Sequence, residues 1–430
     1  MYRSIYLLRS HPYESSSPIC LPSQDAVTNT ATTRTSTRHE RLPLAGLLAL
    51  AMTGFICIIT ETLPAGLLPQ MAGGLRVSTS LAGQTVTAYA LGSLLAAIPM
   101  TIATQSWRRR SALLLAIVGF LLFNTITALS SHYWLTLVAR FCAGVSAGLA
   151  WSLLAGYARR MVPARQQGQA LAVAMVGTPL ALSLGVPLGT WMGTAVGWRS
   201  AFAAMSGLTL ALIVWVLAKV PDYPGQAGHV KLPLRRVFTT PGVRSVLGVV
   251  MAWMLAHNIL YTYVAPFVAQ AGLEAQVDVV LLTFGLAALV AIGIAGHRVD
   301  RHLRATVLAS LAIFAVVSLM FIWLAYTPVA IFVGVAIWGL TFGGAATLLQ
   351  TALADAAGDG ADVALSMNVV VWNSAIAGGG LVGGLLLDAW GARSFPPVMA
   401  LLLALGFAIA WSARGHGFRS GPRHTHLQEH

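Results

Sequence analysis

The chain has 430 residues, of which 57% are hydrophobic and only 9% are charged. Soluble domains carry about 25% charged residues, so a soluble fold of this length could not cover its surface with the polar side chains at hand. The formal net charge of +13 does not indicate nucleic-acid binding, because the basic residues lie in short runs between apolar segments. The composition predicts an all-α polytopic membrane protein.

The amino-terminal residues 1–41 are polar, rich in Ser, Thr and Arg, and lack periodicity. We expect them to form a disordered cytoplasmic tail. Beyond them, twelve mostly apolar segments approach or exceed the length of about 20 residues that a helix needs to cross a bilayer. These segments are 44–68, 81–104, 111–130, 133–157, 168–195, 199–219, 243–269, 277–296, 303–325, 328–351, 363–388 and 396–413.

A proline-rich stretch divides the twelve segments into two groups of six. It contains Pro221, Pro224, Pro233 and Pro241 and is predicted to be a cytoplasmic linker. The predicted domains are the tail 1–41, a first six-helix bundle 42–219, the linker 220–242, a second six-helix bundle 243–413 and a cytoplasmic tail 414–430.

The two groups resemble each other. Residues 89–116 and residues 282–309 each consist of a glycine-containing span, a basic turn and the start of a new span. This similarity fits an internal duplication. Transporters built from such repeats place their substrate site near the bilayer midplane, between the repeats.

Basic residues set the orientation of the spans. The turns on one side contain only Arg76, Arg199 and Arg393, whereas the other side carries runs such as 108–110 and 298–304. Lys and Arg concentrate on the cytoplasmic side of membrane proteins. Both termini are therefore predicted to be cytoplasmic.

Five stretches within residues 42–413 form recognisable motifs. Three of them are GHRVDRHLR (296–304), RFCAGVSAG (140–148) and GTPLALSLGVPLGTWMGTAVGWRSAF (177–202). These three resemble motifs of the major facilitator superfamily, within its branch of twelve-span drug:proton antiporters and sugar efflux transporters. The other two, TETLPAGLLP in the first span and HNILYTYVAPF in the seventh, resemble an arabinose-exporter-like subgroup of that branch. The first-half copy of the cytoplasmic motif departs from the pattern, because TIATQSWRRR (101–110) contains neither the Asp nor the preceding Gly.

The resemblance implies a secondary active transporter in the bacterial cytoplasmic (inner) membrane. Such a protein would export a small organic solute, a sugar or a drug-like molecule, in exchange for protons by alternating access, as a monomer. An uncoupled facilitator or importer of a sugar or nucleoside, in which Glu61 binds the substrate, stays open. So does a non-transporting membrane sensor or scaffold.

Glu61 and Arg140 are the candidates for proton coupling. A charged residue at the centre of a span costs about 2.5–3.5 kcal/mol on insertion scales, and burial favours the neutral carboxylic acid. Arg140 lies at a similar predicted depth in the fourth span, so we expect the two groups to be within reach of each other. The alternatives are a Glu61 that reaches the outer water, and an Arg140 that only bonds carbonyl groups.

Polar and aromatic residues on three spans are candidates for substrate binding. Trp253, His257 and Tyr261 share a face of the seventh span at i, i+4, i+8 spacing, where rings could stack on a ligand and polar tips fix its orientation. Packing and interhelical hydrogen bonding are the alternative. The predicted set is Tyr89, Trp253, His257, Asn258, Tyr261, Asn368 and Trp372.

Two further groups are candidates for gating. Prolines kink a helix and glycines permit close packing, which predicts a bendable fifth span; close packing alone would explain the same residues. The turn after the eighth span carries an acid among bases. The predicted set is Gly177, Pro179, Gly185, Pro187, Gly189, Asp300, Arg301 and Arg304.

The sequence shows no site for a cofactor or a metal. Cys20, Cys57 and Cys142 are far apart and give no metal-ligand spacing, and the histidines of RHTHLQEH (423–430) are interpreted as part of a tail. No phosphate-binding loop or nucleophile motif is present. Neither an enzyme nor an ATP-driven pump is expected.

Overall fold

The structure is a computed structural model that describes residues 42–163, 166–225, 234–419 and 421. The predicted tail 1–41, most of the tail 414–430 and the middle of the predicted linker lie outside this range. The described residues are helical almost throughout and include no strand, as the predicted all-α class requires.

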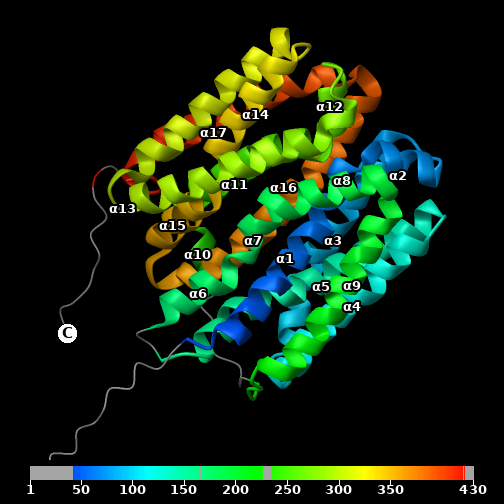
Figure 1. Ribbon diagram of the computed structural model, residues 1–430. Helices are drawn as coiled ribbons and strands as arrows, with labels where there is room; N and C mark the ends of the chain where they lie inside the picture. Colours follow the sequence, from blue (N-terminus) through cyan, green and yellow to red (C-terminus); the bar gives the residue numbers. More distant parts are fainter. Residues whose placement is uncertain (1–41, 164–165, 226–233, 420, 422–430) are drawn as a thin grey trace, which may run out of the picture. The chain divides into compact units, whose positions relative to one another are not determined.

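The first half consists of helices that follow the six predicted segments within a few residues (Figure 1). They are α1 (Leu44–Gly66), α2 (Leu68–Leu75), α3 (Thr79–Ala103), α4 (Arg109–Leu129), α5 (Tyr133–Arg160), α6 (Gln167–Met175), α7 (Gly177–Leu180), the π-helix η2 (Ala181–Gly185), α8 (Val186–Val196) and α9 (Trp198–Lys219).

The second half begins with the short linker helix and ends in a single 3-10 turn after the last span. Its elements are α10 (Leu234–Phe238), α11 (Val243–Thr262), α12 (Val264–Ala269), η3 (Glu274–Gln276), α13 (Val277–Leu324), α14 (Pro328–Phe342), α15 (Ala345–Ala357), η4 (Gly358–Gly360), α16 (Ala361–Trp390), η5 (Ala392–Ser394), α17 (Phe395–Ser412) and η6 (Ala413–Gly415).

Eleven helical stretches in the described ranges are long and apolar enough to cross a membrane. Large apolar side chains such as Leu188, Val214 and Leu401 are exposed on these helices. Lipid tails can cover such surfaces, whereas in water large exposed apolar surfaces promote aggregation. The prediction of a multi-pass all-α membrane protein is thereby confirmed.

The eighth and ninth predicted spans are two helical segments that meet at a kink within α13, and because α13 counts once, eleven stretches stand where twelve segments were predicted. A straight helix of its 48 residues would be about 70 Å long, more than twice the apolar thickness of about 30 Å that a bilayer offers. The helix departs from helical geometry at His302 (φ −133°, ψ 27°). Residues 297–301 contain neither glycine nor proline, the two strongest helix breakers, which fits a helix that continues to that point.

Prolines interrupt the spans that open each half. Pro69 follows the break between α1 and α2 at Leu67, and Pro266 follows the break between α11 and α12 at Tyr263. Because proline has no N–H, each removes one helical hydrogen bond near the break. Despite its break, the first span does not end at Gly66 but continues as α2.

The fifth span packs along α1 in a parallel arrangement with a constant register. A methyl group added at Gly177, Gly185, Gly189 or Gly193 would collide with a residue 126 positions earlier in the chain, on α1 or directly after it. The respective neighbours are Ala51, Ile59, Leu63 and Leu67. Glycine is needed here because it allows the two backbones to approach closely.

The same span contains a π-helical segment, Ala181–Gly185, which ends two residues before Pro187. Pro187 cannot donate to the carbonyl of Ser183, and its ring crowds that carbonyl. Widening the turn to π geometry is one way to relieve this clash. The fifth span thus departs from regular α-helical geometry beside Pro187.

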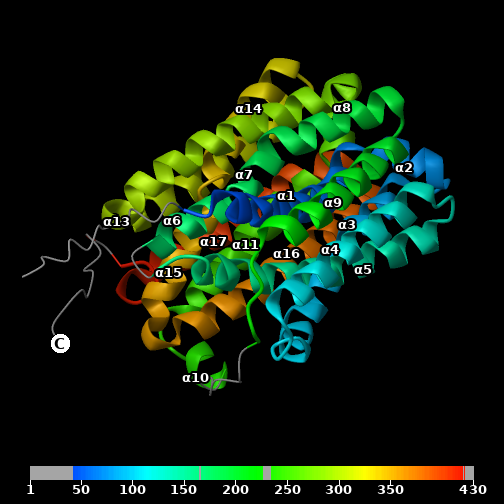
Figure 2. The ribbon, with the colours of Figure 1, turned by 60° about the horizontal axis from the view of Figure 1, so that its bottom comes forward.

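The halves meet where α3 and α16 lie side by side (Figures 1 and 2). Gln84 Nε2 donates hydrogen bonds to the Tyr263 hydroxyl (3.3 Å) and to the Gly380 carbonyl (3.2 Å). The Tyr263 hydroxyl donates to the Gly380 carbonyl (2.7 Å), and Thr87 donates to the Ala377 carbonyl (3.5 Å). These residues lie near the start of α3 and in the second part of α16, which the predicted orientation assigns to the outer side. We refer to them as the outer contact.

Candidate functional site

Glu61 lies on α1, five residues before the end of that helix. Its exposed fraction is 8%, and it is the one buried carboxylate among the acidic side chains that the structure describes. Tyr89 of α3, Arg140 of α5 and Tyr261 of α11 all interact electrostatically with it. The carboxylate is thus placed where helices of both halves approach α1.

Arg140 is fully buried and bonds two main-chain carbonyl groups. Its Nε donates to the Thr85 carbonyl and its Nη2 to the Glu61 carbonyl, both at 3.3 Å. The guanidinium carbon lies 4.9 Å from the centroid of the Tyr89 ring, within the range of a cation–π contact. Nη1 has no hydrogen-bond partner. Arg140 and Glu61 are adjacent, as expected, but the contact is to the backbone of Glu61 and not to its carboxylate.

Tyr89 contacts Arg140 and is hydrogen-bonded to α1 near Glu61. Its hydroxyl donates to the Cys57 carbonyl at 2.9 Å, one turn before Glu61, and its side chain is fully buried. The ring is therefore held between α1 and Arg140. The structure places the predicted substrate-binding residue Tyr89 as a neighbour of the Glu61–Arg140 pair.

The predicted face of the seventh span is assembled into an aromatic cluster. His257 stacks on Phe342 with ring centroids 3.5 Å apart and on Tyr261 at 5.2 Å, and Trp338 Nε1 donates to His257 Nδ1 at 3.1 Å. Trp253 meets Phe342 edge to face at 6.4 Å. The structure thus brings Trp253, His257 and Tyr261 together around one set of rings.

The remaining polar candidates lie apart from this cluster. Asn258 donates to the Met254 carbonyl of its own helix at 2.8 Å and packs against Gly379 of α16. Asn368 of α16 is buried with its Oδ1 unpartnered, and Trp372 on the same helix is half-buried.

Three aromatic residues of the cluster were absent from the predicted site: Phe284, Trp338 and Phe342. They lie on the eighth and tenth spans, where most neighbouring residues are also apolar. An aromatic residue in such a helix gives no pattern that distinguishes a site from packing. The one sequence feature that could have indicated these residues as site candidates is the position of their spans in the second repeat.

Several buried polar atoms have no hydrogen-bond partner, and two of these groups lie beside Glu61. Arg140 Nη1 has none, and the Tyr261 hydroxyl, although close to Thr62, makes none of ordinary geometry. Trp253 Nε1 on α11 and Asn368 Oδ1 on α16 are also buried without a hydrogen bond. A buried polar group without a partner is costly. These groups can therefore bond a ligand that brings both donors and acceptors.

The gating candidates fall into two places. Gly177, Gly185 and Gly189 form the close contact with α1 described above. Asp300 and Arg301 are exposed on α13, whereas Arg304 Nη1 donates to the carbonyls of Ala410 (2.8 Å) and Phe418 (3.2 Å). Arg304 thus fastens the start of the ninth span to the end of the last span. Among the described residues, no cluster of His, Cys, Asp and Glu could hold a metal ion.

Comparisons with known proteins agree with this architecture. Residues 50–380 match the family model described as Major Facilitator Superfamily. The human organic anion transporter MFSD10 (TETRAN) has a similar fold, with a TM-score of 0.64 over 86% of this chain and 99% of that chain, at 17% sequence identity.

Curated relatives are similar over most of their length. The purine ribonucleoside efflux pump NepI of Shigella sonnei is 30% identical over 354 residues, which cover 81% of this chain and 89% of the relative. The pump of the same name from Escherichia coli (strain K12) is 30% identical over 360 residues, covering 83% and 90% respectively. The buried carboxylate, the two groups of spans and these similarities lead to one conclusion: the chain belongs to the major facilitator superfamily and is a membrane transporter, not an enzyme.

Proposed function

We propose that this protein exports a nucleoside-like organic solute across the bacterial cytoplasmic membrane in exchange for protons. The observation that carries the proposal is the burial of Glu61 beside unpartnered donors and acceptors from both halves. Residues 42–219 and 243–413 are the two bundles that move relative to each other. Both termini are cytoplasmic, and the functional unit is a monomer.

Glu61 is the proton site in this proposal. Ionised, it is attracted by the Arg140 guanidinium, whose Nη1 has no other partner, while Nη2 stays on the Glu61 main-chain carbonyl. Protonated, it is neutral and releases that attraction, so proton and substrate can alternate at one place. A group buried this deeply is more easily neutralised than one in water, which suits a proton carrier.

The substrate class follows from the chemistry around Glu61 and from the relatives. Rings of His257 and Tyr261 can stack on a planar base, and unpartnered polar atoms can bond base edges and sugar hydroxyls. The relatives are named as purine ribonucleoside efflux pumps. A purine nucleoside satisfies both requirements better than a simple sugar, which lacks a planar ring.

The conformation fits the uptake step of export. The outer contact joins the halves on the side that the predicted orientation makes extracellular. With that side closed, a solute would enter from the cytoplasm. Release outside would require breaking the hydrogen bonds of Gln84 and Tyr263.

The test uses everted membrane vesicles and radiolabelled inosine. With an acidic lumen, vesicles carrying the protein should accumulate inosine, and a protonophore should abolish accumulation. Glu61→Gln should lose pH-driven accumulation while keeping inosine exchange without a gradient, since the glutamine mimics the protonated acid. Glu274→Gln, which neutralises an exposed carboxylate, should behave as the parent.

Three results would contradict parts of the proposal. Inosine flux in the parent protein that does not depend on the pH gradient would indicate an uncoupled facilitator. Full pH-driven accumulation by Glu61→Gln would remove Glu61 from proton coupling. Absence of flux for inosine and for a panel of sugars and drugs would favour a non-transporting role.

A further inference from the structure

The first cytoplasmic turn lacks the acid that its counterpart in the second half possesses. The stretches 89–116 and 282–309 are offset by 193 residues, which aligns Asp300 with Trp107. Residues 104–110 contain three arginines and no carboxylate. Three adjacent positive charges beside a helix start are unfavourable, because the amino end of a helix is itself positive.

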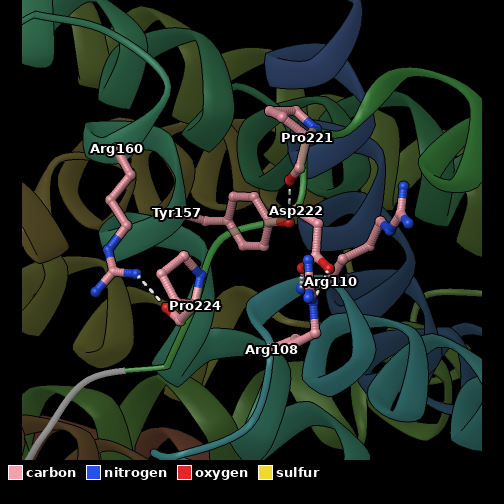
Figure 3. Close-up of polar contacts among 7 residues, drawn as sticks. All are labelled: Arg108, Arg110, Tyr157, Arg160, Pro221, Asp222 and Pro224. Atoms are coloured by element: carbon pink, nitrogen blue, oxygen red, sulfur yellow. Dashed lines mark hydrogen bonds and ion pairs between the residues drawn. The ribbon is translucent and has the colours of Figure 1, made fainter.

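The structure supplies a carboxylate to this turn from another segment, as Figure 3 shows. Asp222, which follows the last span of the first half, forms an ion pair with the Arg108 guanidinium. Its Oδ1 also accepts a hydrogen bond from the Arg110 backbone N–H at 3.1 Å. The adjacent Tyr223 carbonyl accepts from the Arg109 N–H at 2.8 Å.

These contacts cap α4 in the absence of a local cap. The residue before the helix, Arg108, makes no side-chain capping bond, and the first N–H groups of a helix have no partner within it. Asp222 and Tyr223 satisfy two of them from 112 or more residues away. The carboxylate is only 14% exposed and lies at the positive end of the helix dipole.

The same segment is held from its other side by α5. The Tyr157 hydroxyl donates to the Pro221 carbonyl at 2.6 Å, and Arg160 Nη1 donates to the Pro224 carbonyl at 2.9 Å (Figure 3). The rings of Tyr157 and Tyr223 meet edge to face at 5.7 Å. Residues 221–225, which we call the PDYPG segment, therefore bridge the cytoplasmic ends of α4 and α5.

The second half makes a corresponding tie with different chemistry. There Arg304, at the start of the ninth span, donates to the carbonyls of Ala410 and Phe418 at the end of the last span. In both halves the segment that follows the sixth span returns to the start of the third. The acid lies in the turn itself in the second half, as Asp300, and in the returning segment in the first.

We propose that Asp222 is the positioning residue of the first cytoplasmic turn and takes the place of the acid that this turn lacks. It fixes the amino end of α4 and the side chain of Arg108. It also makes the PDYPG segment part of the first bundle, so that the connection between the halves starts after Gly225. The inference concerns the cytoplasmic face and is independent of the proposed substrate and of proton coupling.

The test measures hydrogen exchange of the full-length protein in nanodiscs, with no substrate and no pH gradient. In Asp222→Ala, the Arg109 and Arg110 amides should exchange at least about tenfold faster than in the parent, since their acceptors are lost or released. Asp222→Asn keeps an oxygen that can accept from Arg110 and should show a smaller increase. Glu274→Ala, which removes an exposed carboxylate elsewhere, should leave this region unchanged.

A second variant distinguishes replacement of the missing acid from simple packing. Trp107→Asp restores an acid at the position that corresponds to Asp300. Combined with Asp222→Asn, or with Asp222→Ala where that single variant folds, it should return the exchange of residues 109–110 towards the parent rate. Unchanged exchange in both Asp222 variants, or no recovery with Trp107→Asp, would overturn the proposal. Because no transport is measured, failure of the proposed substrate or coupling would not produce either result.

Discussion

Arg140 and Glu61 meet through the main chain: the guanidinium Nη2 lies 3.3 Å from the backbone carbonyl oxygen of Glu61. A second bond, from Nε to the Thr85 carbonyl, fastens α5 to α3 as well. The arginine thus joins three helices independently of the charge on the Glu61 carboxyl. The same residue can therefore hold the bundle together in both protonation states of that acid.

Replacing Arg140 with Lys should impair both stability and transport. A lysine ammonium lacks the planar fork that reaches two carbonyl groups at once, and each buried carbonyl left without a donor costs about 1–3 kcal/mol. We expect a lower melting temperature in detergent and at least about tenfold slower export, because that cost corresponds to one or two powers of ten in an equilibrium. The exposed Arg159→Lys is the matched control. An Arg140→Lys protein with parental stability would show that the two carbonyl bonds matter little.

Enlarging Gly189 should separate α1 from the fifth span. A valine there would push against Leu63, and overpacking a tight contact costs about 1–3 kcal/mol. Gly189→Val should reduce the yield of folded protein and slow export. Gly207→Val on α9 is the control, since nothing lies within 4 Å of that position. Equal behaviour of the two variants would argue against the close contact.

Removing the Tyr263 hydroxyl should loosen the outer contact. Tyr263→Phe keeps the ring but loses the hydrogen bond to the Gly380 carbonyl (2.7 Å) and the acceptor of Gln84. The halves should then separate more often on this side. A cysteine at Ser80, in a protein whose native cysteines are replaced, should react about three to ten times faster with an impermeant maleimide applied from outside, as expected for the loss of a bond worth about 1 kcal/mol. If the cysteine is labelled equally fast with Tyr263 and with Tyr263→Phe, the hydrogen bond of Tyr263 does not limit the opening of the outer side.

The contribution of Asp222 to stability should depend on pH. Partial burial acts to raise the pKa of Asp222, but hydrogen bonds from the Arg108 side chain and the Arg110 amide, together with both positive charges, lower it below its usual value. Arg109 and Arg160 are the other charged groups near the PDYPG segment. A lowered folded-state pKa stabilises the protein above the unfolded pKa of about 4, and this stabilisation is lost as the pH falls through the folded value.

Thermal melting in detergent tests this direction of the pH dependence. The parent should melt above Asp222→Asn at pH 7 and at pH 5, and the difference should shrink below pH 4. A difference that persists unchanged at pH 3 would mean that the carboxylate charge is not what stabilises the turn.

Hydropathy predicted the helices well because the bilayer imposes one length on every span. The ends of α4, α9 and α17 lie within two residues of the predicted limits. The break at His302 likewise lies between the predicted eighth and ninth spans, 277–296 and 303–325, but hydropathy could not show that residues 297–301 of the turn are themselves helical. Helix propensity and membrane burial are separate properties, and hydropathy reports only the second.

The candidate site was predictable only where a residue contradicts its surroundings. Glu61 stands out because an acid among apolar residues is costly. Phe342 does not stand out, and its stacking on His257 depends on how two distant spans pack. Asp222 was no more visible, because an acid in a proline-rich loop is ordinary and its partners lie far away in the chain.

The outer contact also has an evolutionary consequence. Its acceptors at residues 377 and 380 are main-chain carbonyls, which every amino acid possesses. Position 377 can therefore change among small residues without loss of its bond, whereas position 380 must stay glycine, because even a methyl group there would collide with the Thr87 hydroxyl. For the bonds themselves, selection acts on the donors, so Gln84 and Tyr263 should be retained together or lost together among related transporters.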